Sequence, residues 1–444
     1  MRRRRPALQL FSLFGLGPAA DGGVTFEAAL GDHPPTIARP PADSGPAVDL
    51  AGAPARPGGC RADRPVRKLA GMTVPVDLLA ERLRRAAEEA ARQNVDLLVV
   101  TPGTDLRYLL GLDTSTHERL SCLVLAAAGH RAPPAIVVPR LEAPGLAELP
   151  LDKLGIEVVT WTDGEDPYLL VSDLAGVPRR VAVADTMPAL HVLGLRDALP
   201  GVAQTLAGGV LAELRMRKDA AEVAELRTAA EAIDRVHARM GEFLRPGRTE
   251  AQVGADITDA IVAEGHTDAA FVIVGSGPNG ASPHHDLSDR VIQPGDVVVI
   301  DIGGPVDTGY NSDCTRTYAV GGQPGEDVLR TYAVLQEAQE AACRAVRPGV
   351  SAESVDAAAR QVIAAAGFGE QFVHRTGHGI GLDVHEAPYI VGGNELELAP
   401  GMAFSVEPGI YLDGRWGARI EDIVVVTEHG GERLNGRPRD LVVL

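Results

Sequence analysis

Two histidines seven residues apart lie in the glycine-rich segment TGHGIGLDVHE, which runs from Thr376 to Glu386. Three glycines in this segment make a poor helix and permit tight turns and the close approach of a ligand. We therefore expect His378 and His385 to lie on a shaped loop or strand end. An isolated pair is better explained by one structural histidine and one exposed histidine, so a chemical role depends on partners elsewhere in the chain.

Four carboxylates provide candidate partners, because each stands at the end of a predicted strand or within one. Asp301 ends an apolar run, and Asp313 follows twelve residues later, beyond a turn predicted at residues 307–309. We expect these two aspartates on one hairpin. In the last quarter of the chain Glu407 ends MAFSVE, and Glu421 precedes a strongly β-branched run.

An internal repeat relates the two pairs of carboxylates. Residues 245–265 align with residues 347–367 at a constant offset of 102, and both segments contain RPG, a predicted helix and a final glycine. The offset continues into GSG at 275–277 and GHG at 377–379. The order of helix, glycine pair and acidic strand therefore occurs twice. An approximate twofold would bring all four carboxylates to one place beside His378.

Clustered carboxylates need counterions. Two unit charges about 4 Å apart repel by roughly 4 kcal/mol at an effective dielectric constant near 20, and two divalent cations would cancel four negative charges. Four carboxylates and one imidazole form an oxygen-rich ligand set without a thiolate. This set suits Mn²⁺ best, with Co²⁺, Zn²⁺ or Fe²⁺ also possible. Two such ions can activate a water and polarise a carbonyl, which predicts metal-assisted hydrolysis.

Hydrolysis of an amide also needs donors for the tetrahedral oxyanion and a proton for the leaving amine. The chain offers His284, His374 and His385, together with Arg419 two residues before Glu421. In an extended segment the adjacent His285 would point to the opposite side.

The composition and charge of the chain argue against several other kinds of protein. The formal charge is −18, from 60 acidic and 42 basic side chains, which disfavours binding to nucleic acid or to an anionic membrane surface. No apolar run reaches the roughly 18 residues of a membrane-spanning helix. Four scattered cysteines suggest neither a disulfide framework nor a thiolate metal site and favour the reducing cytoplasm: Cys60, Cys122, Cys314 and Cys343.

The chain divides into three predicted parts. Residues 1–71 are rich in proline and glycine, and we expect a disordered extension or an overlong start before Met72, although Arg2 to Arg5 and the apolar residues after them imitate a secretory signal. Residues 72–206 alternate helical and strand patterns, which predicts an α/β domain. Residues 207–444 hold the repeat, and their first helix is predicted from Leu211 to Leu244.

With these residues in hand, residues 211–444 resemble the pita-bread metallopeptidases, the family of methionine aminopeptidase, aminopeptidase P and prolidase. The resemblance rests on an ordered set of motifs: PHH at 283–285, DIGG at 301–304, NSDCTRT at 311–317, HRTGHGIGLDVHE at 374–386, VEPGIY at 406–411 and RIED at 419–422. Residues 72–206 look like the creatinase-type N-terminal domain, with features such as TPGTDLRYLLG at 101–111. The expected fold is an α/β N-terminal domain followed by an α+β pita-bread domain with an internal pseudo-twofold.

The resemblance implies a dinuclear metal site. Its ligands would be Asp301, Asp313, His378, Glu407 and Glu421, and Glu407 would also accept a proton from the attacking water. It further implies that His284, His374 and His385 contact the substrate, that Arg419 supports the ligands, and that the chain is a homodimer. In this family the two aspartates usually lie eleven residues apart, so the turn between Asp301 and Asp313 carries one extra residue and makes Asp313 the ligand that most needs testing.

The implied substrate is a small peptide with proline at its second position, because aminopeptidase P and prolidase carry the creatinase-type domain and cleave the bond preceding proline. The 14-residue span from Glu407 to Glu421 resembles prolidase more closely, but a dipeptidase and an aminopeptidase both remain open. The alternatives are a creatinase-like hydrolase, which uses this fold without metal, and a pita-bread module that binds peptides without catalysis.

Overall fold

The computed structural model describes residues 74–115 and 117–444. The extension predicted for residues 1–71 and the start predicted at Met72 lie outside the described residues, as does Cys60.

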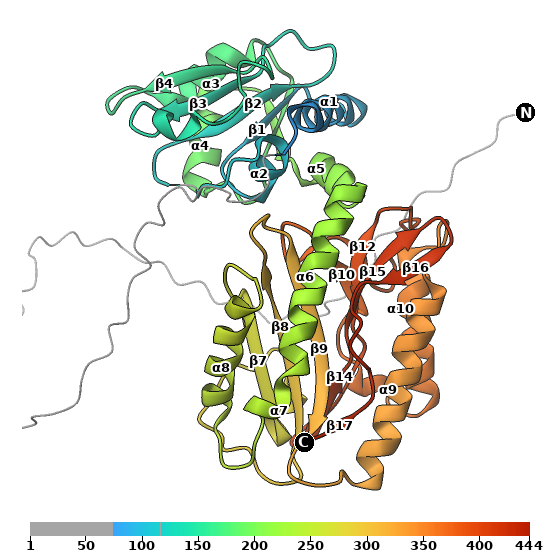
Figure 1. The fold of residues 1–444 in the computed structure, drawn as a ribbon. Coiled ribbons are helices and arrows are strands. Elements are labelled where there is room, and N and C mark those ends of the chain that lie inside the picture. Colours follow the sequence, from blue (N-terminus) through green and yellow to red (C-terminus); the bar gives the residue numbers. More distant parts are fainter. Residues whose placement is uncertain (1–73, 116) are drawn as a thin grey trace, which may run out of the picture. The chain divides into compact units, whose positions relative to one another are not determined.

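The first part of the described chain is built on a six-stranded mixed sheet of order β4-β3-β2-β1-β5-β6 (Figure 1). β1 pairs antiparallel with β2 and parallel with β5. The strands are β1 (Leu97–Val100), β2 (Cys122–Ala126), β3 (Ala135–Pro139), β4 (Glu157–Trp161), β5 (Arg180–Val183) and β6 (Ala203–Leu206). The predicted α/β character of this part is confirmed.

Helices on this sheet follow the apolar spacing of the sequence. In α1 (Val76–Arg92) the residues Leu79, Leu83, Ala86 and Ala90 are buried, as expected for one face of an amphipathic helix. The other helices of this part are α2 (Thr104–Leu110), α3 (Pro167–Ala175) and α4 (Ala189–Ala198), with a short 3₁₀ turn at Ala143–Leu146.

The single helix predicted from Leu211 to Leu244 is wrong. The structure has α5 (Gly208–Arg215), α6 (Ala220–Ala238) and the short α7 (Met240–Phe243) instead. The break comes where Lys218 donates its backbone N–H to the Gly401 carbonyl at 2.8 Å. Asp219 then caps α6, and the Glu222 side chain returns a hydrogen bond to the Asp219 N–H. This capping box starts a new helix inside an otherwise continuous apolar pattern.

Two sheets form the frame of the second part (Figure 1). One has the order β17-β9-β8-β7 and the other the order β11-β10-β12-β15-β16, and β13 pairs with β14 in a separate ribbon. The strands are β7 (Phe271–Ser276), β8 (Val297–Pro305), β9 (Asn311–Ala319), β10 (Gly377–Gly379), β11 (Glu386–Ile390), β12 (Ala403–Val406), β13 (Gly409–Leu412), β14 (Trp416–Arg419), β15 (Asp422–Thr427), β16 (Gly430–Arg433) and β17 (Val442–Val443).

The predicted duplication is visible in these elements. Helices α8 (Glu250–Ala263) and α10 (Ala352–Ala365) begin and end at the offset of 102 residues found in the sequence. β7 and β9 flank β8 in antiparallel pairs, and β10 and β15 flank β12 in the same way. Gly247 and Gly349, both in RPG, have φ values of 88° and 82°. The two halves therefore repeat the same units, as the pseudo-twofold requires.

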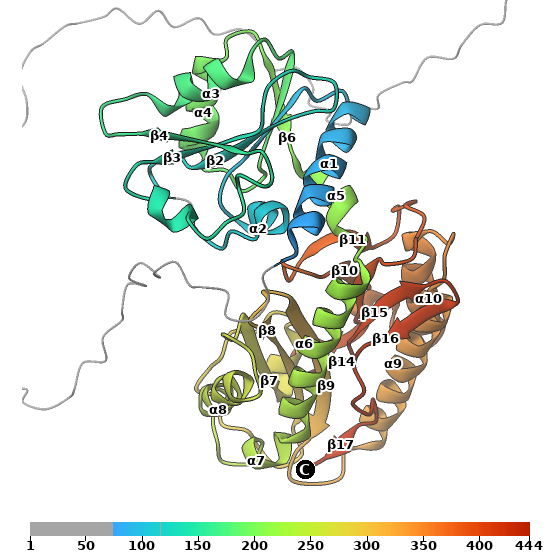
Figure 2. The ribbon, with the colours of Figure 1, turned by 45° about the horizontal axis from the view of Figure 1, so that its top comes forward.

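Helices cover the outer faces of the two sheets. α9 (Glu326–Ala345) and α10 lie side by side in both ribbon views, and α6 packs against β9 (Figure 2). One core forms between α9, α10 and β12, with Leu335, Ile363 and Phe404 fully buried. The inner faces of the sheets are left to the polar residues of the site.

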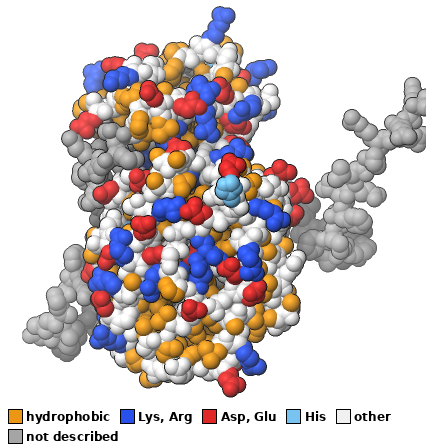
Figure 3. Space-filling view, turned by 45° about the vertical axis from the view of Figure 1, so that its right-hand side comes forward, with side chains coloured by type: hydrophobic (Ala, Val, Ile, Leu, Met, Phe, Trp, Pro, Cys, Tyr) orange, Lys and Arg blue, Asp and Glu red, His pale blue; other side chains and the backbone are white. Residues whose placement is uncertain are grey.

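The surface carries mixed charges. On the face shown in Figure 3, acidic and basic side chains are interspersed over the described residues. No helix in the described part of the chain is long and apolar enough to cross a membrane.

Candidate active site

Asp301 and Asp313 lie on the predicted hairpin, which consists of β8 and β9. Asp301 pairs with Thr315 and Asp313 pairs with Gly303, so both carboxylates point to the same face of the sheet. The loop after Pro305 is closed by a hydrogen bond of 3.0 Å from the Val306 N–H to the Tyr310 carbonyl. With a spacing of twelve residues, Asp301 and Asp313 thus remain on one face of the hairpin.

His378 is the central residue of the short strand β10. Its Nδ1 lies 3.1 Å from the Gly379 carbonyl oxygen and therefore donates its proton there. Nε2 therefore faces the cavity, where it donates to Glu407 when the ring is protonated and offers its lone pair to a cation when the ring is neutral. The flanking glycines permit this close packing, because a Cβ on Gly377 would lie 1.8 Å from the Ser405 carbonyl oxygen and one on Gly379 would lie 2.2 Å from that of Ala387.

Glu407 and Glu421 come from adjacent strands of the second sheet. Val406 pairs with Asp422, so Glu407 directly after β12 and Glu421 directly before β15 meet at the same level. The Thr315 hydroxyl donates a hydrogen bond of 2.7 Å to Glu421 Oε2. Glu421 is thereby connected to the hairpin of the first sheet.

These residues converge on one cavity of about 1010 Å³. Ligand atoms of Asp313, His378 and Glu421 lie within 4.8 Å of one another. Glu407 Oε1 lies 3.2 Å from His378 Nε2. Asp301 stands beside this group, and all five predicted ligands line the cavity.

The pKa shifts of these carboxylates show that they repel one another, as expected of a group that binds cations. Burial raises the pKa of Asp313 well above its usual range, and the neighbouring Asp301 carboxylate adds to the rise. Burial likewise raises the pKa of Glu421, with Asp313 as the next cause. Glu407 behaves differently: burial is the largest single effect and raises its pKa, but the hydrogen bond and charge of His378, together with His374 and Arg419, outweigh burial and lower the pKa.

An unsatisfied oxygen points to the same conclusion. Asp301 Oδ1 is buried, and no described residue donates a hydrogen bond to it. A buried carboxylate oxygen without a donor is costly. The four carboxylates, together with the Nε2 lone pair of a neutral His378, are the electron-pair donors that this cavity offers to a cation. This donor set fits divalent cations that prefer oxygen ligands with some imidazole.

Arg419 is fully enclosed and joins several of these groups. Its Nη2 donates to Asp301 Oδ2 at 2.6 Å, and its Nε donates to the Thr315 hydroxyl at 3.0 Å. Its Nη1 donates to the Tyr411 hydroxyl at 2.8 Å, and this hydroxyl lies 2.8 Å from His374 Nε2. Because His374 Nδ1 donates to the Arg375 carbonyl at 2.7 Å, Nε2 accepts the Tyr411 proton. Both ring nitrogens of His374 are thus engaged with protein groups.

The other predicted histidines occupy the open side of the cavity. His284 and His385 are exposed and line it. The ring of His385 lies 4.0 Å from that of His378 between centroids. Burial and the neighbouring His378 lower the pKa of His385 to about 4. His285, which was expected to point elsewhere, places Nε2 2.8 Å from the buried carboxylate of Glu250.

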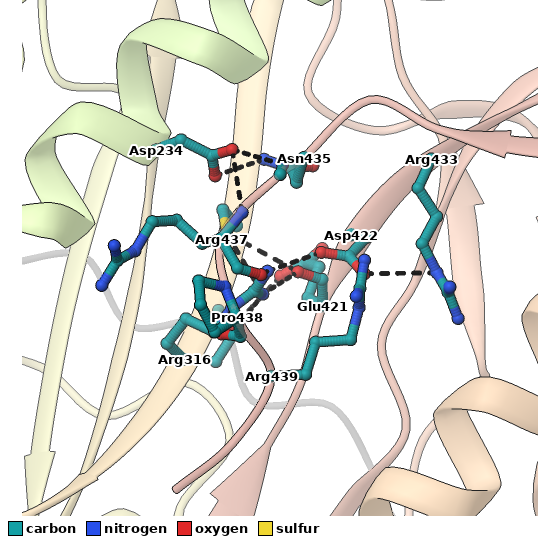
Figure 4. Close-up of polar contacts among 12 residues, drawn as sticks. Asp234, Arg316, Glu421, Asp422, Arg433, Asn435, Arg437, Pro438 and Arg439 are labelled. Atoms are coloured by element: carbon teal, nitrogen blue, oxygen red, sulfur yellow. Dashed lines mark hydrogen bonds and ion pairs between the residues drawn. The ribbon is translucent and has the colours of Figure 1, made fainter. Parts of the chain in front are cut away.

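A buried ion network supports Glu421 from behind (Figure 4). Arg316 donates to the Glu421 backbone carbonyl at 2.6 Å and to Asp422 Oδ1 at 2.7 Å. Asp422 is fully buried, and its second oxygen accepts hydrogen bonds from Gln339 and Arg439. The start of β15 is therefore fixed on the side away from the cavity.

Three hydroxyl residues of the site were not predicted. Tyr411 links Arg419 to His374, Thr315 binds Glu421, and the Ser405 hydroxyl donates to Glu407 at 3.1 Å. Ser405 and Thr315 each lie two residues from a predicted ligand, so the two-residue period of a strand was a usable signal. Tyr411 lies in the VEPGIY motif but carries no such signal.

The sequence matches two known family models, one in each part of the described chain. Residues 224–428 match the family model of metallopeptidase family M24, and residues 82–217 match the model of the creatinase/prolidase N-terminal domain.

The alignments with similar proteins include most of this chain and nearly all of each relative. A probable dipeptidase, PepE, of Mycobacterium tuberculosis is 59% identical over 369 residues, which span 83% of this chain and 97% of the relative. The Xaa-Pro dipeptidase of Lactobacillus helveticus is 34% identical over 361 residues, spanning 79% of this chain and 95% of that protein. The crystal structure of dipeptidase PepE from Mycobacterium ulcerans superimposes with a TM-score of 0.80 at 59% identity, covering 84% of this chain and 99% of that one.

Proposed function

The chain belongs to metallopeptidase family M24 and is therefore a peptidase, and on this basis we propose that it is an Xaa-Pro dipeptidase. It hydrolyses the bond preceding proline in Xaa-Pro dipeptides, and longer peptides with N-terminal Xaa-Pro are the alternative substrates. The names of two relatives, a probable dipeptidase and an Xaa-Pro dipeptidase, support this assignment. The convergence of four carboxylates and one histidine on a single cavity is the observation that carries the proposal.

Two divalent metal ions, most favourably Mn²⁺, would be held by residues of both repeat halves. The ligands proposed are Asp301, Asp313, His378, Glu407 and Glu421. The bound ions would supply Lewis-acid polarisation of the substrate carbonyl and a lowered pKa for water. The unsatisfied Asp301 Oδ1 and the raised pKa values of Asp313 and Glu421 support this fit.

Glu407 serves as the general base. Its ionised carboxylate lines the cavity among the proposed ligands, where it can accept a proton from the attacking water. The Ser405 hydroxyl and His378 Nε2 contact the same oxygen, Oε1, and hold the carboxylate at the cavity wall.

His284 and His385 are the groups placed to contact substrate. With a pKa of about 4, His385 is neutral at neutral pH and retains one ring N–H that can donate to a substrate oxygen. His374 acts differently, because both of its ring nitrogens are engaged. It holds the Tyr411 hydroxyl in the orientation that accepts from Arg419, and Arg419 in turn holds Asp301.

We also propose a cytoplasmic location and a homodimer. Three described cysteines, Cys122, Cys314 and Cys343, are buried free thiols, which suits a reducing compartment. The homodimer rests on the family resemblance and is tested by light scattering of the purified chain. The mixed surface charge and net −18 support small peptides, rather than nucleic acid or membranes, as partners.

Chelation followed by metal restoration tests the proposal. We expect a chelator to abolish hydrolysis of Gly-Pro and Mn²⁺ to restore it, with Gly-Pro cleaved more efficiently than a longer Gly-Pro peptide. Full activity after complete metal removal would contradict the metal mechanism and favour a creatinase-like hydrolase. More efficient cleavage of the longer peptide would identify the chain as an Xaa-Pro aminopeptidase instead of a dipeptidase.

A further inference from the structure

A buried cluster of charges lies beside the site and includes none of the proposed ligands. Glu386, the residue after His385, has a side chain that is 9% exposed and binds two cations. Lys218 Nζ donates to Glu386 Oε1, and Arg215 Nη2 donates to Oε2 at 2.5 Å. The Lys218 side chain is 1% exposed and also donates to the Arg215 carbonyl at 2.8 Å.

Arg215 extends this cluster to helix α2. Its Nη1 donates to Asp105 Oδ1 at 2.7 Å, and its Nη2 donates to Asp383 Oδ2 at 2.7 Å. The Thr104 hydroxyl donates to the same Asp383 oxygen at 2.8 Å. The segment between β10 and β11, which contains His385, is therefore tied to a helix that contributes no residue to the cavity lining.

The same segment is fixed on its other side by the strand of Asp313. Asn311, at the start of β9, donates its backbone N–H to the Gly381 carbonyl at 2.9 Å, and its Nδ2 donates to the Leu382 carbonyl at 2.9 Å. Gly381 lies directly against the ion pair, because a Cβ there would be 2.7 Å from Glu386 Oε1. The backbone on both sides of His385 is thus anchored by side chains from α2, α5 and β9.

His385 depends on this anchoring. Its ring is exposed, and none of the described residues hydrogen-bonds to it. The ring nevertheless lies 4.0 Å from the ring of His378, facing the cavity. Its position must therefore follow from the backbone and from Glu386 beside it.

Stability alone does not explain such a cluster. Removing both ions of a buried pair from water is costly, so replacement of the pair by apolar residues is often neutral or stabilising. Buried charges can instead select one conformation of a segment, which is the property that a catalytic loop requires.

We propose that Arg215, Lys218 and Glu386 are positioning residues that fix His385 beside His378 for contact with the substrate. The proposal rests on the substrate-facing role given to His385 above. Asp105 on α2 contributes to the same positioning by holding the Arg215 guanidinium.

A double-mutant cycle tests the proposal. Glu386→Gln should lower kcat for Gly-Pro by about 10- to 100-fold with KM nearly unchanged, because a displaced donor loses contact mainly in the transition state. The same change made in a His385→Ala background should lower kcat by less than about twofold, since nothing remains to be positioned. Equal losses in both backgrounds would overturn the proposal.

Further variants separate positioning from misfolding. Asp105→Asn removes one partner of Arg215 that lies on α2, outside the segment of His385, and should lower kcat by a smaller factor that also disappears in the His385→Ala background. Arg248→Met is the matched control, because Arg248 pairs with Asp256 and the Phe243 carbonyl away from the cavity. It should lower the melting temperature and leave kcat unchanged. Full activity of His385→Ala would contradict the substrate-contacting role proposed for His385. If His385→Ala is strongly impaired and Glu386→Gln lowers kcat by the same factor with and without it, only the positioning role of Glu386 would be contradicted.

Discussion

Three of the four carboxylates proposed as ligands are each held by a second protein group. Arg419 holds Asp301, Thr315 holds Glu421, and Ser405 holds Glu407. The five proposed ligands could be selected from sequence because the internal repeat relates the four acidic positions and the motifs of the family resemblance contain all five residues. Ser405 and Thr315 could have been selected from their positions two residues from a ligand, but which carboxylate each contacts depends on the register between strands, and nothing in the sequence singled out Tyr411.

Replacing Glu407 with alanine is the sharpest single-residue test of the chemistry. We expect a loss of at least about 100-fold in kcat for Gly-Pro, since the proposed base is removed. The circular dichroism spectrum should stay that of the wild type. Glu428→Ala, at an exposed turn after β15, is the control and should be fully active. Near-normal activity of the Glu407 variant would mean that another group accepts the proton.

Helices and strands were predicted correctly where the apolar pattern of the sequence ended at a turn or capping residue. The β8–β9 hairpin carries both aspartates, as predicted, and the described residues between 72 and 206 alternate helices and strands, as predicted. The predicted helix from Leu211 to Leu244 failed because the apolar period continues through the break. What interrupts it is a tertiary contact, the pairing of Lys218 with Gly401, together with the cap at Asp219.

The packing of α6 on β9 makes stability depend on pH. His237 of α6 is fully enclosed, with ring nitrogens 2.9 Å from the Tyr318 hydroxyl and 3.1 Å from the Cys314 carbonyl. Burial, with a further contribution from Arg316, lowers the pKa of His237 to about 3. The unfolded chain protonates this histidine near pH 6.5. Between these values the unfolded state binds more protons, so stability falls as the pH is lowered below about 6.5.

The expected contribution is at most about 1.4 kcal/mol of unfolding free energy per pH unit in that window. Urea denaturation at a series of pH values measures it. His237→Gln should flatten the curve between about pH 4 and 6.5, whereas the same change at the exposed His429 should leave the slope as it is. An unchanged slope in the His237 variant would rule out this residue as the source.

The molecule as a whole uses duplication to assemble the site. Two copies of a helix and three antiparallel strands contribute acidic residues from each half, and the sequence revealed this through the RPG and GxG landmarks. It did not reveal the ties between distant segments, such as Arg215 with Asp383 and Glu386, because ion pairs across many residues have no local pattern. The boundary predicted after residue 206 falls between β6 and α5.

The residues before Met72 are predicted to be dispensable for catalysis. All residues that line the cavity lie between Ala270 and Glu421, and the 59% identical relative aligns with 83% of this chain while covering 97% of its own length. A chain beginning at Met72 should match the full chain in kcat/KM for Gly-Pro and in melting temperature. Insolubility or loss of activity on truncation would show that the first 71 residues are needed.

The most direct test of the two-metal site is the number of Mn²⁺ ions bound by the metal-stripped chain, measured by equilibrium dialysis. We predict two ions per chain for the wild type and fewer for Asp313→Asn and Glu421→Gln, because each variant removes a carboxylate from the shared group. Binding of one ion or none by the wild type, or full binding by both variants, would contradict the site described for these five residues.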